Sequence, residues 1–331
     1  MYLILHFMVI VTVFLVLVCT LATWLPLIRT HKWWIRIFDF PRLQITVLAV
    51  FTLILVLVYL IGQPSFFYSS LLLILSAIIY QSLSMVRYTP LYPNISEKAI
   101  GVDASNTFSI MMSNVKMDNE NYDKYLEVVY KSDPDVILLN EVNRKWVDAI
   151  SQLDSIYPYR IKHPLENTYG MALYSKFKLH DAEINELLVK DIPSIYVNLE
   201  LPSGYKVTLH CVHPEPPKIG SDTYERDTEI LLIGKRIVNE KKPCVVVGDL
   251  NDVAWSYTSE LFQKRCSLID PREGRGFFNT YNVFVPLLRY PLDHFFYTDN
   301  FKYVMLQRLE AYGSDHFPMM LKLEYIPDET N

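Results

Sequence analysis

The sequence contains few cysteines, and their spacing excludes two classes of small stabilised domain. Four occur among 331 residues: Cys19, Cys211, Cys244 and Cys266. No pair has the spacing of a metal knuckle or of a disulfide framework, so we expect reduced cysteines with a structural role, as is usual in a reducing compartment. Internal repeats and low-complexity tracts are also absent.

Charged residues are scarce in the first part of the chain. Residues 1–87 hold five of the 31 Lys and Arg residues and one of the 36 Asp and Glu residues, which leaves 26 and 35 for residues 88–331. The first part therefore carries a net charge of about +4 and the second part about −9. Such asymmetry indicates a membrane anchor followed by an acidic soluble domain.

Three apolar runs fill the first part, at Tyr2–Ile28, Leu43–Ile61 and Phe66–Val86. Each is close to the ~20 residues that a helix needs to cross a bilayer. The first run differs from a signal peptide because no basic region precedes it, it is too long, and further runs follow. We predict a membrane anchor with three transmembrane helices at residues 1–87, a linker at 88–105 and a soluble domain at 106–326.

The segment between the first two runs sets the predicted topology. Arg29–Arg42 is basic, whereas the short loop Gln63–Ser65 is uncharged. The positive-inside rule then places the basic segment in the cytoplasm, and the third helix returns the chain to that side. We expect an integral protein of a bacterial inner membrane whose soluble domain faces the cytoplasm, with the periplasmic or extracellular face as the alternative.

From residue 106 onward, the patterns of strands and helices alternate. Expected strands lie at 108–115, 135–142, 168–174, 194–201, 205–213, 244–247, 292–297, 303–309 and 317–325, and expected helices lie at 121–132, 144–153, 222–240 and 257–266. Strand hairpins mixed with helices predict an α/β fold of stacked layers, not a simple parallel doubly wound sheet.

Polar residues stand at the ends of these strands. The β-branched strand that begins at Cys244 delivers Gly248, Asp249 and Asn251, and a carboxylate beside an amide suits a hard cation and an oriented water. Any one such residue is also typical of an ordinary turn or cap. The complete series in chain order is Asn114, Glu141, His213, Asp249, Asn251, Asp293, Asp315 and His316. Buried polar groups of this kind are rare unless they are paired or bind metal.

With these motifs, the chain resembles the endonuclease/exonuclease/phosphatase superfamily, which has the deoxyribonuclease I-like fold, over about residues 106–326. The matching motifs are Ser-Asn114-Val, Leu-Leu-Asn-Glu141-Val, Tyr-Gly170-Met-Ala-Leu-Tyr-Ser, Val-His213-Pro-Glu-Pro-Pro, Gly-Asp249-Leu-Asn251, Leu-Asp293-His-Phe-Phe and Gly-Ser-Asp315-His316-Phe-Pro. The resemblance implies a four-layer α/β sandwich with two central mixed β-sheets. It also implies a metal-dependent hydrolase that directs water in line at a phosphate ester.

The resemblance further implies a role for each motif residue. Mg²⁺, or Mn²⁺, would bind at Glu141 with Asn114 beside it, and Asp315 would serve the metal or the water. Asp249 and Asn251 would hold the attacking water and a phosphate oxygen, with Asp249 as the general base, and His213 would be the general acid. His316 would stabilise the charge on the phosphate, oriented by Asp293 through its second ring nitrogen.

Three of five further residues allow two interpretations. Tyr169 is assigned to the substrate site or to the core, and Arg226 to a substrate phosphate or to a solvated helix face. His210 lies three residues before His213 and should point to the opposite face of its strand, as a structural residue. Lys116 stands where some nucleases of the family carry an acid, and Arg275 binds substrate or lies in a loop.

The charge of the soluble domain bears on the substrate. Proteins that grip a nucleic-acid backbone usually carry a basic stripe, and this sequence has none. We therefore expect a lipid or small-molecule phosphate ester as substrate and the bilayer as a partner, with nucleic acid possible but not favoured and no protein partner inferable. The alternatives are a membrane-tethered endonuclease or exonuclease acting on DNA or RNA, and a non-catalytic anchored interaction domain.

Overall fold

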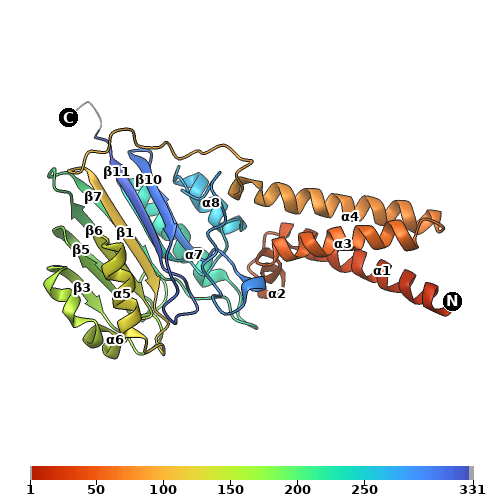
Figure 1. The fold of residues 1–331 in the computed structure, drawn as a ribbon, viewed down its shortest axis with the longest axis horizontal. Helices are drawn as coiled ribbons and strands as arrows, with labels where there is room; N and C mark the ends of the chain where they lie inside the picture. Colours follow the sequence, from red (N-terminus) through yellow and green to blue (C-terminus); the bar gives the residue numbers. More distant parts are fainter. Residues whose placement is uncertain (1, 328–331) are drawn as a thin grey trace.

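The computed structural model describes residues 2–327 and divides into a helical bundle and an α/β sandwich (Figure 1). The bundle contains α1 (Tyr2–Trp24), α3 (Arg42–Tyr59) and α4 (Pro64–Met85). It projects from one end of the sandwich, and the N-terminus lies at its far tip.

The three helices of the bundle are long and apolar enough to cross a membrane. Small side chains such as Cys19, Ala49 and Ala77 are fully buried in the bundle, together with larger apolar ones such as Val56 and Ile74. Other large apolar side chains point outward; Val47 is 64% exposed and Leu72 is 71% exposed. This distribution suits helices that meet at small residues and face lipid elsewhere.

The sandwich is built on two mixed β-sheets. One sheet has six strands in the order β10-β11-β1-β2-β4-β3, and the other has five in the order β5-β6-β7-β8-β9. Neighbours pair antiparallel except β1 with β2 and β7 with β8, which are parallel. The strands are β1 (Thr107–Asn114), β2 (Val136–Asn140), β3 (Tyr159–His163), β4 (Met171–Ser175), β5 (Leu179–Asn185), β6 (Ser194–Glu200), β7 (Lys206–Val212), β8 (Cys244–Asp249), β9 (Asp293–Tyr297), β10 (Phe301–Arg308) and β11 (Met319–Tyr325).

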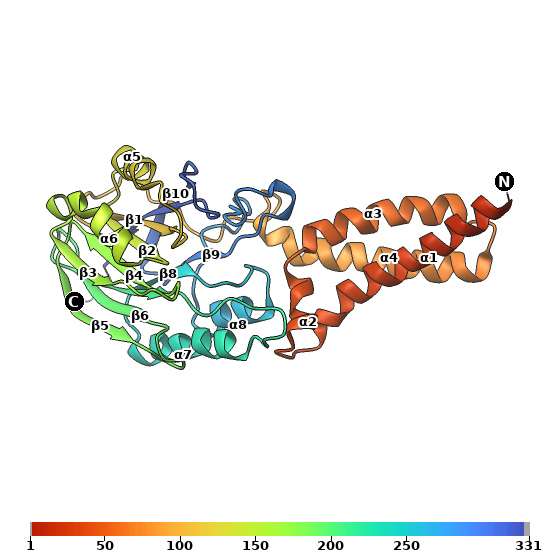
Figure 2. The same ribbon diagram turned by 90° about the horizontal axis from the view of Figure 1, so that it is seen from below.

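Helices cover the outer face of each sheet, so the expected four layers are confirmed (Figure 2). The first sheet is covered by α5 (Tyr122–Ser132) and α6 (Arg144–Ala149), and the second by α7 (Tyr224–Glu240) and α8 (Tyr257–Arg265). Between the sheets lies the main core, in which Ile110, Leu138, Leu209 and Val245 are at most 1% exposed. Short apolar runs formed strands here because both of their faces are buried.

Two strands were missed by the sequence patterns, β3 and β5. Both lie at the edges of their sheets, and β5 has four exposed residues in a row, Asp181–Ile184. An edge strand with one open face has less need for apolar side chains, so its periodicity is weak.

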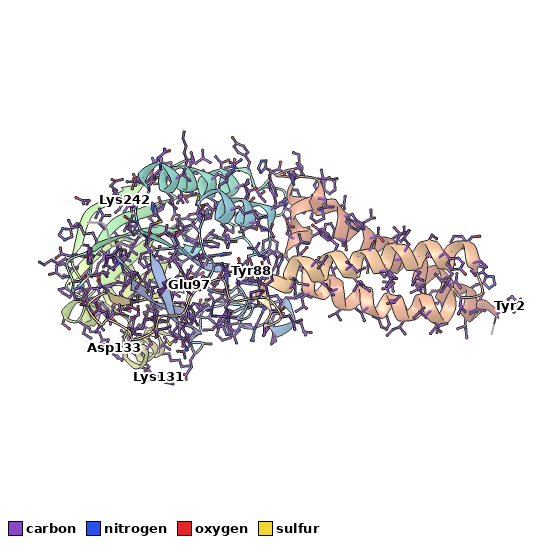
Figure 3. The ribbon with its side chains drawn as sticks, turned by 90° about the horizontal axis from the view of Figure 1, so that it is seen from above. Tyr2, Tyr88, Glu97, Lys131, Asp133 and Lys242 are labelled. Atoms are coloured by element: carbon purple, nitrogen blue, oxygen red, sulfur yellow. The ribbon has the colours of Figure 1, made fainter. Side chains whose placement is uncertain are left out.

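The segment 88–105, which was expected to be a linker, packs against the sandwich. Tyr88 at the bundle end donates its hydroxyl to the Ala254 carbonyl at 2.9 Å. Farther along, the backbone of Glu97 and Ala99 pairs with Tyr303 of the edge strand β10, with N···O distances of 2.7 and 2.9 Å. The segment therefore packs along the sandwich from Tyr88 past Glu97 (Figure 3). The segment binds there because β10 is an edge strand, whose outer backbone N–H and C=O groups are free to pair with another segment.

The loop between α1 and α3 also contacts the sandwich. The His31 Nδ1 atom lies 2.9 Å from Asp227 Oδ2, and the Trp33 backbone N–H donates to Asp222 at 3.2 Å. The Trp255 indole donates to the Asp39 carbonyl at 2.7 Å. The basic loop and the sandwich therefore lie on the same side of any membrane that the bundle crosses.

Candidate active site

Asn114 connects the two sheets at the ends of three strands. It ends β1 and is paired with Asn140 at the end of β2, so Glu141 follows directly beside it. Its Nδ2 donates to Glu141 Oε1 at 2.8 Å and to Asp249 Oδ2, from the other sheet, at 3.1 Å. The parallel pairs β1–β2 and β7–β8 thus deliver their carboxyl ends to one place.

The backbone around these residues adopts conformations that few side chains tolerate. Glu141 and Asn251 have φ values of 63° and 51°, in the left-handed region. A Cβ on Gly248 would lie 1.9 Å from the Val212 carbonyl oxygen, so only glycine lets β8 pass β7 at this point. Left-handed residues of this kind cluster at functional sites, where the surrounding fold holds them in place.

His316 lies between two aspartates. Its Nδ1 is 2.8 Å from Asp293 Oδ2, and its Nε2 is 3.5 Å from Asp249 Oδ2. One ligand atom from each of the three residues lies within 4.8 Å of the others. Burial disfavours the charged imidazole, but the charges of Asp293 and Asp249 outweigh it and raise the pKa of His316 to about 10. The ring is therefore a cation at neutral pH.

Whereas the two aspartates favour the charged form of His316, burial favours the neutral form of Asp249 and raises its pKa to about 6 despite the nearby His316 charge. Its Oδ1 accepts the Asn251 backbone N–H at 2.9 Å. Asn251 donates its side-chain amide to the Pro214 carbonyl at 3.0 Å, which ties the β8 loop to the segment after His213. A carboxylate with a raised pKa is better matched to accepting a proton near neutral pH than an ordinary aspartate.

His213 borders the same centre from the end of β7. Its Nε2 is 4.0 Å from Asp249 Oδ2, and its Nδ1 has no hydrogen-bond partner among residues 2–327. Burial lowers its pKa, which favours the neutral ring. Tyr169 packs against it with ring centroids 5.6 Å apart, and burial raises the pKa of this phenol, so Tyr169 is a neutral wall residue.

Asp315 lies at the more open side, with its side chain 22% exposed. Its charge contributes to raising the pKa of both Glu141 and His316. The Lys116 ammonium lies 3.9 Å from Asp315 Oδ2, so a cation stands where some nucleases of the family carry a second acid.

Arg226 lies elsewhere, and neither interpretation of it from the sequence fits its surroundings. The side chain is 2% exposed and donates through Nε and Nη2 to Asp227, at 3.1 and 2.8 Å. Its Nη1 donates to the Asn251 carbonyl at 2.8 Å. The first turn of α7 packs against the β8 loop, so the arginine supports the site from behind and lies on no solvated face. Its assignment to substrate phosphate has no geometric support.

His210 and Arg275 also lie outside the centre. His210 packs edge-on against Tyr196, and burial lowers its pKa to about 4. Arg275 donates to the Ser96 carbonyl at 2.8 Å and stacks on Tyr303 at 3.9 Å. Both residues have structural contacts.

Three residues of the site were not singled out from the sequence. The ring of Tyr281 lies 4.9 Å from that of His316. Tyr312 and Ser314 both donate to the Asn114 carbonyl, at 2.9 and 2.7 Å. Ser314 stands in the last quoted motif, which was the available signal. The tyrosines lie in loops with no periodic pattern.

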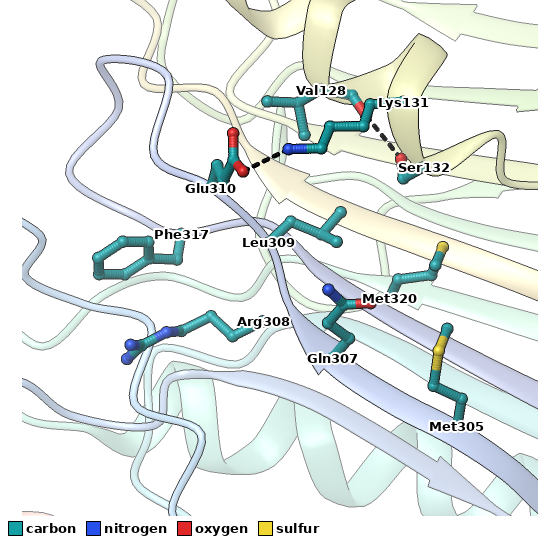
Figure 4. Close-up of a pocket in the computed structure, with 10 residues that line it drawn as sticks. All are labelled: Val128, Lys131, Ser132, Met305, Gln307, Arg308, Leu309, Glu310, Phe317 and Met320. Carbon is teal, nitrogen blue, oxygen red and sulfur yellow. Dashed lines mark hydrogen bonds and ion pairs between the residues drawn. The ribbon is translucent and has the colours of Figure 1, made fainter.

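A hollow of about 380 Å³ between α5 and the strands β10 and β11 is distinct from this centre (Figure 4). Lys131 and Glu310 both line it and pair with each other at 2.5 Å, and the buried Met320 lines it as well. None of the predicted site residues lines it.

The donor set of the centre suits a hard divalent cation. Glu141 is largely buried, and burial raises its pKa, so its charged form lacks solvation that a cation would replace. Its carboxylate accepts from the Asn114 side chain and, at 3.4 Å, from the Met117 backbone. A second possible cluster is Asp249, Asp293 and His316, whose ligand atoms lie within 4.8 Å of one another, but the His316 ring is already held between the two aspartates. Glu141 with Asn114 beside it is therefore the better candidate.

Comparisons with known proteins agree with this fold. Residues 113–316 match the Endonuclease/Exonuclease/phosphatase family. No curated protein sequence matches the chain. Among solved structures, an endonuclease/exonuclease/phosphatase family protein from Bacteroides thetaiotaomicron is similar, with 15% identity, a TM-score of 0.55 and coverage of 67% of this chain and 98% of the other.

Two further structures share the fold of the sandwich. Truncated Caenorhabditis elegans TDP2 has 15% identity and a TM-score of 0.51, with coverage of 67% of this chain and 100% of that one. The human Nocturnin catalytic domain with bound sulfate anion has 19% identity and a TM-score of 0.52, with coverage of 68% and 96%. At these identities the likeness shows the fold, whereas the family match spans most of the sandwich. The chain belongs to the endonuclease/exonuclease/phosphatase family.

Proposed function

We propose that the protein is a membrane-anchored, divalent-metal-dependent phosphoesterase that hydrolyses a lipid or small-molecule phosphate ester. The family consists of hydrolases that act on phosphate esters, and the sandwich has its fold. One observation carries the enzymatic part of the proposal. A charged His316, held by Asp293, faces the buried carboxylate of Asp249, and Asn114 joins that carboxylate to Glu141.

Each residue then has a chemical task. Asp249 accepts the proton of the attacking water, since its raised pKa makes it a suitable base. The imidazolium of His316 stabilises the negative charge that develops on the phosphate oxygens, and Asp293 keeps it protonated and oriented. His213 borders the same space and is the candidate proton donor to the leaving oxygen when its ring is protonated, a form that burial disfavours and the neighbouring Asp249 charge favours.

A divalent cation held by Glu141, with Asn114 beside it, would neutralise phosphate charge and position the substrate. The Glu141 carboxylate offers oxygen ligands, which suit Mg²⁺ or Mn²⁺.

The substrate part of the proposal rests on charge and location. The domain carries an excess of acidic residues, whereas nucleic-acid binding draws on clustered basic ones. The anchor loop contacts the sandwich through His31 and Trp255, so the domain lies against the end of the apolar bundle. A substrate in or near the membrane is within reach of such a domain.

We also propose that the domain faces the cytoplasm of a bacterial cell. The basic loop Arg29–Arg42 and the sandwich are on the same side of the bundle, and basic loops favour the cytoplasm. A reporter fused after the C-terminus should be active in the cytoplasm; activity confined to the exterior would reverse the topology.

The function is tested with the full chain in detergent and a substrate panel at fixed Mg²⁺. Phospholipids, inositol phosphates, single-stranded DNA, plasmid DNA and an aryl phosphodiester are compared in the wild type, E141A and H316A. We expect turnover of the aryl ester and of a lipid or small phosphate ester that both variants lose. Turnover of DNA alone would identify the tethered nuclease, and equal rates in all three proteins would identify a non-catalytic domain.

A further inference from the structure

An exposed apolar loop lies between Tyr281 of the catalytic centre and strand β9. Residues 284–288 are all exposed, and none of them is charged. Phe284 is 59% exposed and Leu287 is 83% exposed, the latter in the 3₁₀-helix η5 (Pro286–Leu288). A single exposed leucine is ordinary on a soluble domain, but a run of large apolar side chains marks a surface that contacts a partner or a membrane.

The loop is held closed by its own hydrogen bonds. Arg289 joins its base, where Nε donates to the Asn282 carbonyl at 3.2 Å and Nη2 donates to the Val283 carbonyl at 2.7 Å. The Leu288 N–H donates to the Val285 carbonyl at 2.9 Å. The loop therefore has a defined shape, although its apolar side chains remain exposed.

Two contacts fix this loop against the end of the bundle. Gln44, the third residue of α3, donates its Nε2 to the Leu287 carbonyl at 2.6 Å. At the base of the loop, the ring of Tyr290 packs edge-on against that of Phe40, which precedes α3, with centroids 5.7 Å apart. Figures 1 and 2 show the segment, in blue, beside the end of the bundle that meets the sandwich. Leu287 thus lies at the level of the first turn of α3.

The length of α3 indicates what surrounds Leu287 at this level. The helix is apolar enough to cross a membrane and has 18 residues, which is close to the shortest length that spans the hydrocarbon layer. Its first turn therefore has to lie at the edge of that layer, where the headgroups begin. Lipid headgroups next to this turn would also surround the loop that is bonded to Gln44.

We propose that residues 284–288 insert into the headgroup layer of the bilayer that the bundle crosses. The proposal rests on the anchor part of the proposed function and not on the hydrolysis. Insertion brings the catalytic centre to the same surface, because the loop also contacts that centre. The Val283 N–H donates to the Asp315 carbonyl at 2.8 Å, and the Tyr281 ring lies 4.9 Å from that of His316. The more open side of the centre, at Asp315, then lies near the headgroups of one leaflet.

The test attaches a nitroxide spin label to single introduced cysteines of the full chain. The protein is placed in nanodiscs of dioleoyl phosphatidylcholine and dioleoyl phosphatidylglycerol, and no substrate is needed. Electron paramagnetic resonance then measures the access of oxygen, which concentrates in lipid, and of Ni-EDDA, which stays in water. The four native cysteines are buried, and the wild type labelled in parallel gives their background.

Four positions are compared. Leu287→Cys reports on the loop, and Phe284→Cys repeats the measurement at its other end. Ile54→Cys is the lipid control, since Ile54 is 54% exposed within α3. Ile184→Cys is the water control, since Ile184 is 42% exposed on β5, at the end of the sandwich away from the bundle.

We expect the ratio of oxygen access to Ni-EDDA access at Leu287 to exceed that at Ile184 by at least about fivefold and to stay below that at Ile54, since an interfacial loop enters only the outer part of the bilayer. Equal ratios at Leu287 and Ile184 would leave the loop in water. Low access of both reagents would mean that protein covers it, such as a second copy of the chain. Either result would overturn the insertion alone, whereas a preference for Ni-EDDA at Ile54 as well would overturn the membrane anchor with it.

Discussion

His316 and Asp293 are in contact within the charged centre, with 2.8 Å between Nδ1 and Oδ2, and this contact fixes which nitrogen of the ring faces Asp249. Asp293 begins β9 and His316 precedes β11, so the pair spans the two sheets. Burial lowers the pKa of His316, and the Asp293 charge is the largest of the influences that raise it, so the protonated state of His316 depends on Asp293.

Asp293→Asn should therefore lower the pKa of His316 and reduce kcat by about 10²–10⁴-fold, since the cation that stabilises the developing charge is lost. In the wild type, the folded-state pKa of about 10 lies above the ordinary value of 6.5. The pair thus stabilises the fold fully below about pH 6.5, and this contribution is lost as the pH rises towards 10. Histidine NMR titration and kcat check the result; exposed Asp299→Asn is the control, and an unchanged titration in D293N would contradict the assignment.

The protonation of Asp249 should set how kcat/KM falls at acid pH, the acid limb of the pH–rate profile. Its carboxylate form is the proposed base, and burial raises its pKa to about 6, so kcat/KM should fall tenfold per pH unit below about pH 6. The measurement is kcat/KM from pH 4.5 to 8 at saturating Mg²⁺. Asp249→Asn should abolish this limb along with most of the activity. A flat profile between pH 5 and 7 in the wild type would exclude Asp249 as the base.

Glu141→Gln tests the metal site. If Glu141 binds Mg²⁺, added Mg²⁺ should raise the Tm of the wild type, with a stabilisation of about 2.7 kcal/mol at 100 times Kd, and should leave E141Q unchanged. Glu310→Gln serves as the control, because this carboxylate is exposed and pairs with Lys131 outside the centre. The same Mg²⁺-induced shift in E141Q and the wild type would place the metal elsewhere.

Gly248→Ala tests the close approach of β8 to β7. The new Cβ would lie 1.9 Å from the Val212 carbonyl oxygen, so the strands must separate, and we expect a loss of about 2–4 kcal/mol in the free energy of unfolding. At Gly204 the same change meets nothing within 4 Å, and only its φ of 90° opposes it, so the expected loss is about 1 kcal/mol. Equal losses in the two variants by denaturant unfolding would contradict this reading of the strand contact.

Arg226→Gln separates a supporting role from a substrate contact. Removing the guanidinium leaves Asp227 and Asp252 buried without their partner, and we expect a loss of about 3–5 kcal/mol in stability. Exposed Arg265→Gln should change stability by less than about 0.5 kcal/mol. A stable R226Q with a raised KM and unchanged kcat would instead support the assignment of Arg226 to a substrate phosphate.

The sequence by itself determined the elements that rest on local pattern. Long apolar runs such as Leu43–Ile61 specify helices, because a helix satisfies its backbone hydrogen bonds within one segment in an apolar environment. The strand at Cys244 follows from a run of β-branched residues. The order of the polar strand ends also carried the resemblance to the family, and the resemblance implied the fold.

Only the tertiary structure decided which side chains are buried and what they contact. The hydrophilic Arg226 is enclosed because α7 packs on the β8 loop, and the segment after Tyr88 is held by the free edge of β10. Tyr281 reaches His316, and Trp255 reaches Asp39, across more than thirty positions of sequence. Such contacts depend on how distant elements are brought together, and local composition carries no record of them.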